Sequence, residues 1–130
     1  VAEEAMHLVK RAMEYRERCG SRDAFLRGIN DRGNQFFDRD MYVFVLDQRG
    51  SYMAFGGNAD KVNTSVHDVP GINGQKLVED MFRQIAVEPG WVEYDITNPV
   101  SGQVQTKLSF VMAVDDLAVG CGVYKGLSGG

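Results

Sequence analysis

The sequence predicts an α+β domain in which a long helix precedes five mainly antiparallel strands. Three observations indicate this fold class. Apolar residues recur at helical spacing from Ala2 to Arg18. The segment from Gly90 to Tyr124 contains three successive strand patterns, and two earlier strand patterns are separated from these by a long loop and a helix. With 130 residues, one domain spanning residues 1–130 accounts for the whole chain.

The N-terminal segment predicts two helices. The first runs from Ala2 to Arg18, and Gly20 ends it. The second is shorter, with Ser21 as its N-cap, because a serine side chain can accept a hydrogen bond from a free amide of the first turn. Its expected buried residues are Ala24, Phe25, Leu26 and Ile29.

The middle of the chain predicts a strand pair, a loop and a helix. The stretch from Met41 to Asp47 is apolar on both faces, which favours a central strand, and Ser51 to Phe55 is its hairpin partner. The connection from Gly56 to Gly74 is rich in Gly, Asn, Asp and Ser, and connections this long in a compact domain are usually binding loops or lids. A helix from about Gln75 to Ala86 follows it, capped near Asn73.

The last three strands are predicted at Gly90 to Ile96, Gln105 to Val114 and Leu117 to Tyr124, with a turn from Asn98 to Gly102 between the first two. Because side chains alternate along a strand, Lys107 shares one face of the middle strand with a mixed set of residues. These are Gln105, Ser109, Val111 and Ala113. A helical crossover between the second and third strands makes this order of elements PAS-like.

Composition and motifs exclude several classes of function. The formal net charge is -4, and no clustered basic surface suited to nucleic acid is evident. No run of about 18 apolar residues exists, so no membrane span is expected. His7 and His67 do not combine with the cysteines in any zinc-binding pattern, and catalytic or phosphate-binding fingerprints are absent from the sequence. We therefore expect no enzymatic activity, no cofactor and no metal.

The two cysteines and the first residue leave alternatives open. Cys19 and Cys121 are compatible with one disulfide in an oxidising compartment or with two separate thiols. A redox role would require the bridge. The chain starts at Val1 without an initiator methionine or a leader, as expected either after removal of a signal peptide or for a piece of a larger membrane protein.

A lysine and several aromatic residues form a candidate binding site. A partly desolvated ammonium on a strand attracts a small anion, and aromatic rings with polar tips supply walls that fix its orientation. The residues concerned are Lys107, Tyr42, Trp91, Tyr94 and Tyr124. On residue types alone the simpler expectation is that Lys107 reaches solvent at a strand end and that the aromatic residues are ordinary core.

Motifs spread over the chain carry a resemblance to a known family. They are Asp40-Met41-Tyr42-Val43-Phe44-Val45-Leu46-Asp47, Gly90-Trp91-Val92-Glu93-Tyr94, Asn98-Pro99, Lys107-Leu108-Ser109-Phe110-Val111 and Gly120-Cys121-Gly122-Val123-Tyr124-Lys125. With these motifs in this order, the chain resembles the single Cache domain family. Members are extracytoplasmic sensor modules of bacterial chemoreceptors and histidine kinases, and some are stand-alone periplasmic proteins.

The resemblance implies a PAS-like fold, a periplasmic or extracytoplasmic location, and a ligand cavity between the sheet and the long loop. It also implies a small organic ligand, often a short-chain carboxylate. By position, Trp91, Tyr94 and Lys107 match motif residues of the family, and Tyr42 matches its first-strand aromatic residue. The chain departs from the family at Phe55, near which many relatives have a histidine. A more apolar pocket, or loss of the usual ligand, is expected from this departure.

Two functions follow as expectations. The first is a sensor for signal transduction or chemotaxis that binds a short-chain carboxylate or similar small molecule, with a homodimer formed through the N-terminal helix. Its expected site residues are Tyr42, Phe55, Trp91, Tyr94, Lys107 and Tyr124. The alternative is a periplasmic protein-interaction or dimerisation module without a small ligand, which predicts a filled interior and an apolar patch on the first helix. The proposed site requires Tyr94 and Lys107 to share a sheet face.

Overall fold

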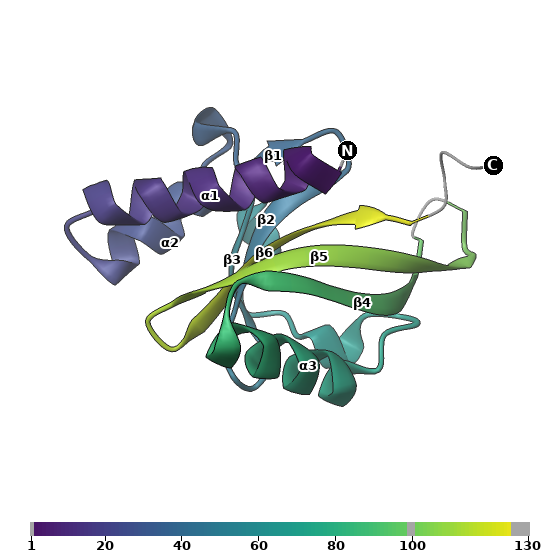
Figure 1. Cartoon of the computed structure of the whole chain (residues 1–130). Helices are drawn as coiled ribbons and strands as arrows, with labels where there is room; N and C mark the ends of the chain where they lie inside the picture. Colours follow the sequence, from purple (N-terminus) through teal and green to yellow (C-terminus); the bar gives the residue numbers. More distant parts are fainter. Residues whose placement is uncertain (1, 99–100, 126–130) are drawn as a thin grey trace.

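One antiparallel sheet with helices on both faces forms the fold (Figure 1). The computed structural model describes residues 2–98 and 101–125. Within this part of the chain the strands are β1 (Phe37–Asp38), β2 (Met41–Leu46), β3 (Tyr52–Phe55), β4 (Gly90–Thr97), β5 (Val104–Val114) and β6 (Leu117–Tyr124). Their order in the sheet is β1-β2-β6-β5-β4, and β3 also pairs with β2. The predicted fold class is confirmed, and the two-residue strand β1 is an addition to the five strands predicted.

The helices divide into a pair on one face and a single helix on the other. They are α1 (Ala2–Arg18), α2 (Arg22–Asn30) and α3 (Gly74–Val87), and α1 lies across the sheet opposite α3 (Figure 1). Both predicted N-caps are confirmed. Ser21 Oγ accepts a hydrogen bond from the amide of Ala24 at 3.1 Å, and Asn73 Oδ1 accepts one from the amide of Lys76 at 3.2 Å. None of the helices in the described ranges is long and apolar enough to span a bilayer.

The segment between β3 and α3 is an extended loop with two short 3-10 turns, η2 (Ala59–Lys61) and η3 (Val66–Asp68). Its first part is tied back to the sheet, since the amide of Tyr52 donates to Thr64 O and the amide of Asn63 donates to Tyr52 O. Its last part is tied to β4 because the amide of Thr97 donates to Pro70 O. In the turn predicted from Asn98 to Gly102, residues 99–100 lie outside the described ranges.

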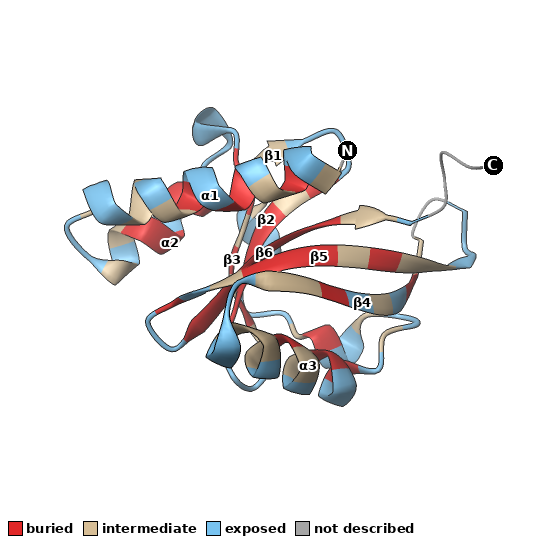
Figure 2. Cartoon of the chain, viewed as in Figure 1, coloured by how far each residue is buried: buried red, intermediate tan, exposed pale blue. Residues whose placement is uncertain are grey.

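Two separate apolar cores lie against the two faces of the sheet (Figure 2). Against α1 and α2, the buried residues include Val9, Phe25, Val43, Val45 and Cys121. Against α3 they include Phe44, Leu77, Met81, Val92 and Val111. The central strand β2 contributes to both cores because its alternate residues point to opposite faces. This confirms the expectation that β2 is covered on both sides.

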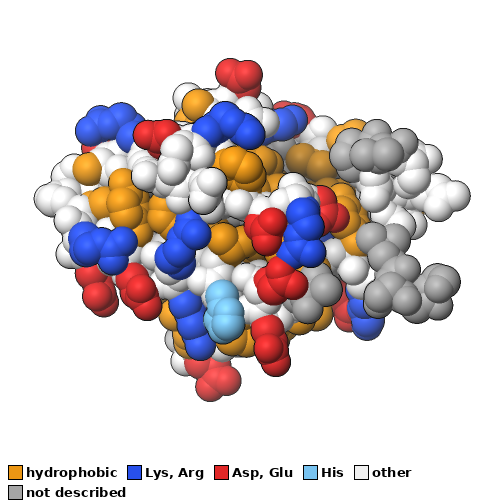
Figure 3. Space-filling view, turned by 90° about the horizontal axis from the view of Figure 1, so that it is seen from above, with side chains coloured by type: hydrophobic (Ala, Val, Ile, Leu, Met, Phe, Trp, Pro, Cys, Tyr) orange, Lys and Arg blue, Asp and Glu red, His pale blue; other side chains and the backbone are white. Residues whose placement is uncertain are grey.

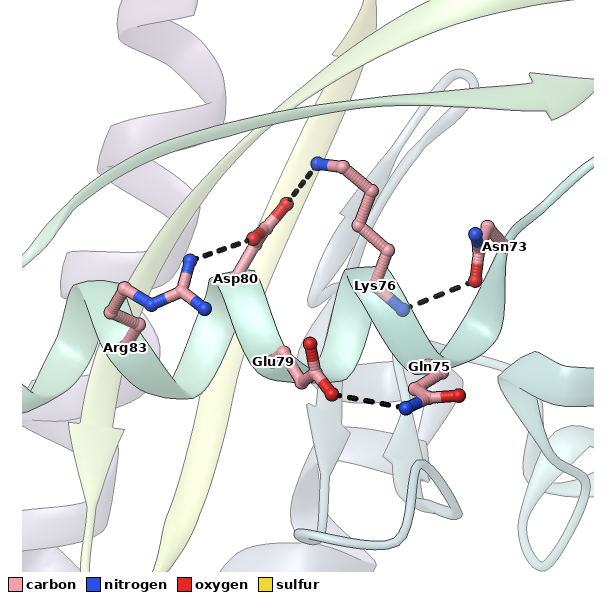
Figure 4. A network of polar contacts seen from close by, with 6 residues as sticks. All are labelled: Asn73, Gln75, Lys76, Glu79, Asp80 and Arg83. Carbon is pink, nitrogen blue, oxygen red and sulfur yellow. Dashed lines mark hydrogen bonds and ion pairs between the residues drawn. The ribbon is translucent and has the colours of Figure 1, made fainter.

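Polar side chains along α3 are linked by hydrogen bonds and ion pairs (Figure 4). Asp80 accepts from Lys76 Nζ at 2.6 Å and from Arg83 at 3.1 Å, and Gln75 donates to Glu79 at 3.2 Å. Pairs of this spacing on a helix surface contribute only about 0.2–0.5 kcal/mol each. The buried face of α3 therefore does most to fix its position beneath the sheet.

Candidate functional site

The strand register brings three of the predicted site residues into one row across the sheet. Tyr94 on β4 lies directly opposite Lys107 on β5, and Lys107 lies directly opposite Tyr124 on β6. Residues that face each other across an antiparallel pair point to the same side of the sheet. The requirement that Tyr94 and Lys107 share a face is therefore met, and Tyr94 packs with the core on the α3 side.

Lys107 is buried, with 2% of its surface exposed. Its Nζ donates a hydrogen bond to the hydroxyl of Tyr42 at 3.1 Å and lies 4.5 Å from the centre of the Tyr42 ring and 5.2 Å from that of Tyr124. The expectation from residue types alone, that this lysine reaches solvent, is wrong because the two tyrosines cover it. None of the ion pairs found among the described residues involves Lys107. The site thus holds a buried cation without a carboxylate partner in that part of the chain.

The surroundings of Lys107 keep it charged. Burial alone lowers the pKa of its ammonium, but the interactions with Tyr94, Tyr42 and Tyr124, including the hydrogen bond to the Tyr42 hydroxyl, outweigh that effect and raise the pKa above its ordinary value. Burial also raises the pKa of Tyr94 and of Tyr124. At neutral pH the cluster therefore consists of one cation and protonated hydroxyl groups that can donate hydrogen bonds.

Two small residues make room for the lysine. Ser109, two positions along β5, shares a hydrogen bond of 2.8 Å with the hydroxyl of Tyr94. Gly122 lies opposite Ser109 on β6, and a Cβ there would come within 2.8 Å of Lys107 Cε and closer still to Ser109 Oγ. The missing side chain at Gly122 gives the lysine stem its path along the sheet. Neither residue belongs to the predicted site, although Ser109 was placed on the Lys107 face by alternation.

A cavity of about 630 Å³ lies between the sheet and the loop that precedes α3. Its apolar and aromatic lining comprises Tyr42, Tyr52, Phe55, Val69, Pro70, Ile96 and Tyr124. Three of the six predicted residues therefore line it. Lys107 is not among the lining residues but is hydrogen-bonded to the hydroxyl of Tyr42, which is, and Tyr94 borders a smaller hollow next to α3 instead.

Trp91 is not brought to this cavity. Its ring packs edge-on against Phe110 with centroids 5.2 Å apart, and it belongs to the core on the α1 side. The separation has a simple cause, since residues 91 and 94 of the same strand point to opposite faces. The structure thus splits the predicted set, and Trp91 has no place in the site described below.

One wall of the cavity is a group of three aromatic rings. Phe55 stacks on Tyr42 with centroids 4.1 Å apart and an interplanar angle of 21°, and meets Tyr52 edge-on at 5.4 Å. Strict alternation would send residues 52 and 55 to opposite faces. A register shift between Val45 and Leu46 in the β2–β3 pair changes the alternation, so that both rings reach the same cavity. Tyr52 was not among the predicted site residues.

This aromatic wall is fastened to the helices on the other side of the sheet. The amide of Phe55 donates to Asn30 Oδ1 at 2.8 Å, and the amide of Gly57 donates to Ile29 O at 3.2 Å. Both acceptors belong to the last turn of α2. The position of Phe55 is therefore coupled to the end of that helix.

The cysteines do not contribute to the cavity. Both are free in the structure, and Cys121 is buried among the residues that face α1. Burial raises the pKa of the Cys121 thiol to about 12, which leaves almost none of the reactive thiolate at neutral pH. The disulfide that the sequence left open is not formed, and a redox role through such a bridge has no support here.

Comparison with known proteins decides the family. Residues 3–126 match the family described as Single Cache domain 2. The chain belongs to this Cache family. The resemblance seen in the sequence is thereby confirmed over nearly the whole chain, and with it the classification as a Cache sensor domain.

Relatives of this Cache domain occur in signalling proteins. This chain is 28% identical over 90 residues to sensor histidine kinase MctS of Rhizobium johnstonii. The match covers 68% of this chain and 20% of that kinase. The matched part thus corresponds to about a fifth of that protein's length.

Solved structures of low identity share the fold. A methyl-accepting chemotaxis protein from Vibrio parahaemolyticus aligns with a TM-score of 0.66 and 16% identity, over 94% of this chain and 86% of the other. A structure described as the basis for carboxylic acid recognition by a Cache chemosensory domain aligns with a TM-score of 0.62 and 19% identity, over 95% and 92%. At these identities the likeness establishes the fold and leaves the ligand open.

Proposed function

We propose that this Cache domain is the extracytoplasmic ligand-binding part of a signal-transduction or chemotaxis protein, and that its ligand is a small carboxylate. Family membership supports the sensor role, and a carboxylic acid is the ligand class named for one structural relative. The observation that carries the ligand class is the buried Lys107 ammonium behind the Tyr42 hydroxyl.

The hydroxyl of Tyr42 links the Lys107 ammonium to the cavity. Its hydroxyl oxygen accepts a hydrogen bond from Lys107, so its own proton is available to a second acceptor. A hydroxyl polarised by an ammonium is a stronger donor, because hydrogen bonds in a chain reinforce one another at low dielectric. A carboxylate at the cavity end of Tyr42 receives this hydrogen bond and lies close to a positive charge that has no ion-pair partner among the described residues.

The effect of a ligand on signalling follows from the loop and the wall that enclose it. The cavity is lined on one side by strands and on the other by loop residues, including Thr64, Ser65 and Val69. A ligand shifts the balance between two conformations only by the difference in its affinity for them. We propose that the enclosed state, with the loop ordered over the ligand, is the one that is favoured, and that it displaces α1 or a dimer contact made by α1.

The homodimer through α1 stays a prediction. The exposed positions of α1 are charged or polar, namely Glu3, Glu4, His7, Lys10, Arg11, Glu14, Glu17 and Arg18. Figure 3 shows charges of both signs spread among the hydrophobic side chains on this side of the molecule. The alternative function predicts an apolar patch on this helix and a filled interior, and neither the polar exposed positions nor the cavity favours it.

The test is calorimetric titration with acetate, propionate, pyruvate and lactate, and with ethanol and ethylamine as probes of equal size without a carboxylate. We expect carboxylates to bind and the neutral and cationic probes not to bind. Lys107→Met should abolish binding, whereas Lys125→Met, which removes an exposed lysine paired with Glu93, should not. If no organic acid of any length binds, or if Lys107→Met binds as well as the native chain, the carboxylate proposal is wrong.

A further inference from the structure

We propose that the ligand is a monocarboxylic acid with an apolar tail of at least roughly four carbons, and that Phe55 is the residue that selects for this tail. The inference rests on the proposed carboxylate binding and adds the part of the ligand that the carboxylate does not specify. Three observations carry it: the size of the cavity, the chemistry of its walls and the charges at its rim.

The cavity is too large for the smallest acids. Acetate has four non-hydrogen atoms, so at about 30 Å³ for each, the share of a water molecule in the liquid, it fills roughly a fifth of the volume. The space available is about 630 Å³. A short acid would therefore leave most of the apolar wall in contact with water, and a longer tail would displace that water and gain the hydrophobic contribution.

The aromatic wall next to Tyr42 offers contact area to an apolar tail, and the polar uncharged residues Thr64, Ser65, Thr97 and Asn98 also belong to the cavity lining. The ring of Phe55 stacks on Tyr42 with centroids 4.1 Å apart, and the ring of Tyr52 meets Phe55 edge-on with centroids 5.4 Å apart. Ile96 and Val69 complete the apolar lining. A histidine at position 55 would add a hydrogen-bonding group to this wall, whereas a phenyl ring adds contact area alone.

The rim of the cavity disfavours a second acidic group. Asp40, Asp68 and Lys61 are the charged residues of the cavity lining, and all three are exposed. Two carboxylates against one ammonium leave a net negative rim. The second carboxylate of a dicarboxylic acid would lie in these surroundings while the first occupied the Tyr42 end, so repulsion opposes it.

The experiment is titration calorimetry on the native chain with acetate, butyrate, hexanoate and octanoate, and with adipate and hexanol as matched probes. Each buried methylene strengthens binding about fourfold, so hexanoate, with four more methylenes, should bind roughly 200- to 300-fold more tightly than acetate. Hexanoate should also bind at least tenfold more tightly than adipate, which differs by a second carboxylate, and than hexanol, which lacks the first.

Phe55→Ala tests the selecting residue. It should flatten the dependence of affinity on chain length, because it removes the ring that contacts the tail but no atom of the Lys107–Tyr42 hydrogen bond. Met53→Ala is the matched control, since Met53 lies on the same strand and packs with the core on the opposite face. It should keep the full dependence on chain length. If Phe55→Ala does not fold, the series on the native chain still decides the ligand class.

The outcomes separate the two proposals. Affinities that are flat or that fall with chain length overturn the tail, while acetate binding would still uphold the carboxylate site. Adipate binding as tightly as hexanoate overturns the restriction to one carboxylate. Hexanol binding as tightly as hexanoate, or no acid binding at any length, overturns the carboxylate site and this inference together. An unchanged dependence on chain length in a folded Phe55→Ala variant overturns the role of Phe55.

Discussion

Tyr42→Phe removes one oxygen atom from the centre of the site and leaves its shape intact. The ring keeps its stack on Phe55 and its face toward the Lys107 ammonium, at 4.1 and 4.5 Å. What is lost is the acceptor of the 3.1 Å hydrogen bond from Lys107. Because only 2% of Lys107 is exposed, water cannot easily take the place of that acceptor.

The expected cost follows from the charge on the donor. Hydrogen bonds to charged groups contribute about 1.5–3 kcal/mol to stability, so the free energy of unfolding should fall by that amount. For a chain of this length the melting temperature should drop by roughly 3–5 °C for each kcal/mol. Hexanoate affinity should fall at least tenfold as well, because the polarised donor to the carboxylate is gone.

The assay is urea unfolding followed by the fluorescence of Trp91, the single tryptophan, which lies on the opposite face of the sheet and does not touch the substituted residue. Tyr52→Phe is the control, since it removes a hydroxyl from the same cavity wall that is not bonded to Lys107. It should cost much less. Equal losses for the two variants, or a neutral Tyr42→Phe, would show that the Lys107–Tyr42 bond carries no special energy.

Three further predictions follow. Gly122→Ala should lower the free energy of unfolding by about 1–3 kcal/mol and weaken carboxylate binding, because the added methyl group collides with the side chain of Lys107. Gly20→Ala, whose methyl group has no atom within 4 Å, should change neither quantity in thermal unfolding and calorimetry. At pH 8 a thiol reagent should modify Cys19 alone in the native chain and both cysteines after denaturation, because burial raises the pKa of Cys121 to about 12. Mass spectrometry counts the labels, and a label on Cys121 of the native chain would contradict its burial. Hexanoate affinity should stay constant from pH 7 to pH 10, because the pKa of Lys107 is raised and the ammonium loses its charge only when the pH exceeds that raised pKa. A decline in affinity that starts below the ordinary lysine pKa would contradict this prediction.

Local signals predicted the helices and most strands. The N-cap at Ser21 is a property of a few consecutive residues, and the spacing of apolar residues gave α1 its observed limits, Ala2–Arg18. The face shared by Tyr94 and Lys107 was also predictable in part, because each strand's alternation is local. Strand β1 was not predicted, since two residues carry no periodicity.

The site required information from separate strands. Burial of Lys107 depends on the empty position at Gly122 and on the ring of Tyr124, both on a strand that pairs with β5. Tyr52 reaches the cavity because of an irregular register between β2 and β3, and no turn residue in the sequence indicates that irregularity. Trp91 could have been set aside from the sequence alone, because it is three positions from Tyr94 on one strand.

The hydrogen bond from the Phe55 amide to Asn30 Oδ1 connects a residue of the cavity wall directly to α2, which lies on the opposite face of the sheet. An occupant that shifts the backbone of Phe55 must either lengthen this bond or move the last turn of α2 with it. Only residues 19–21 separate α2 from the end of α1. Strand β3, which carries Phe55, is therefore connected to α1 through one hydrogen bond, the last turn of α2 and residues 19–21.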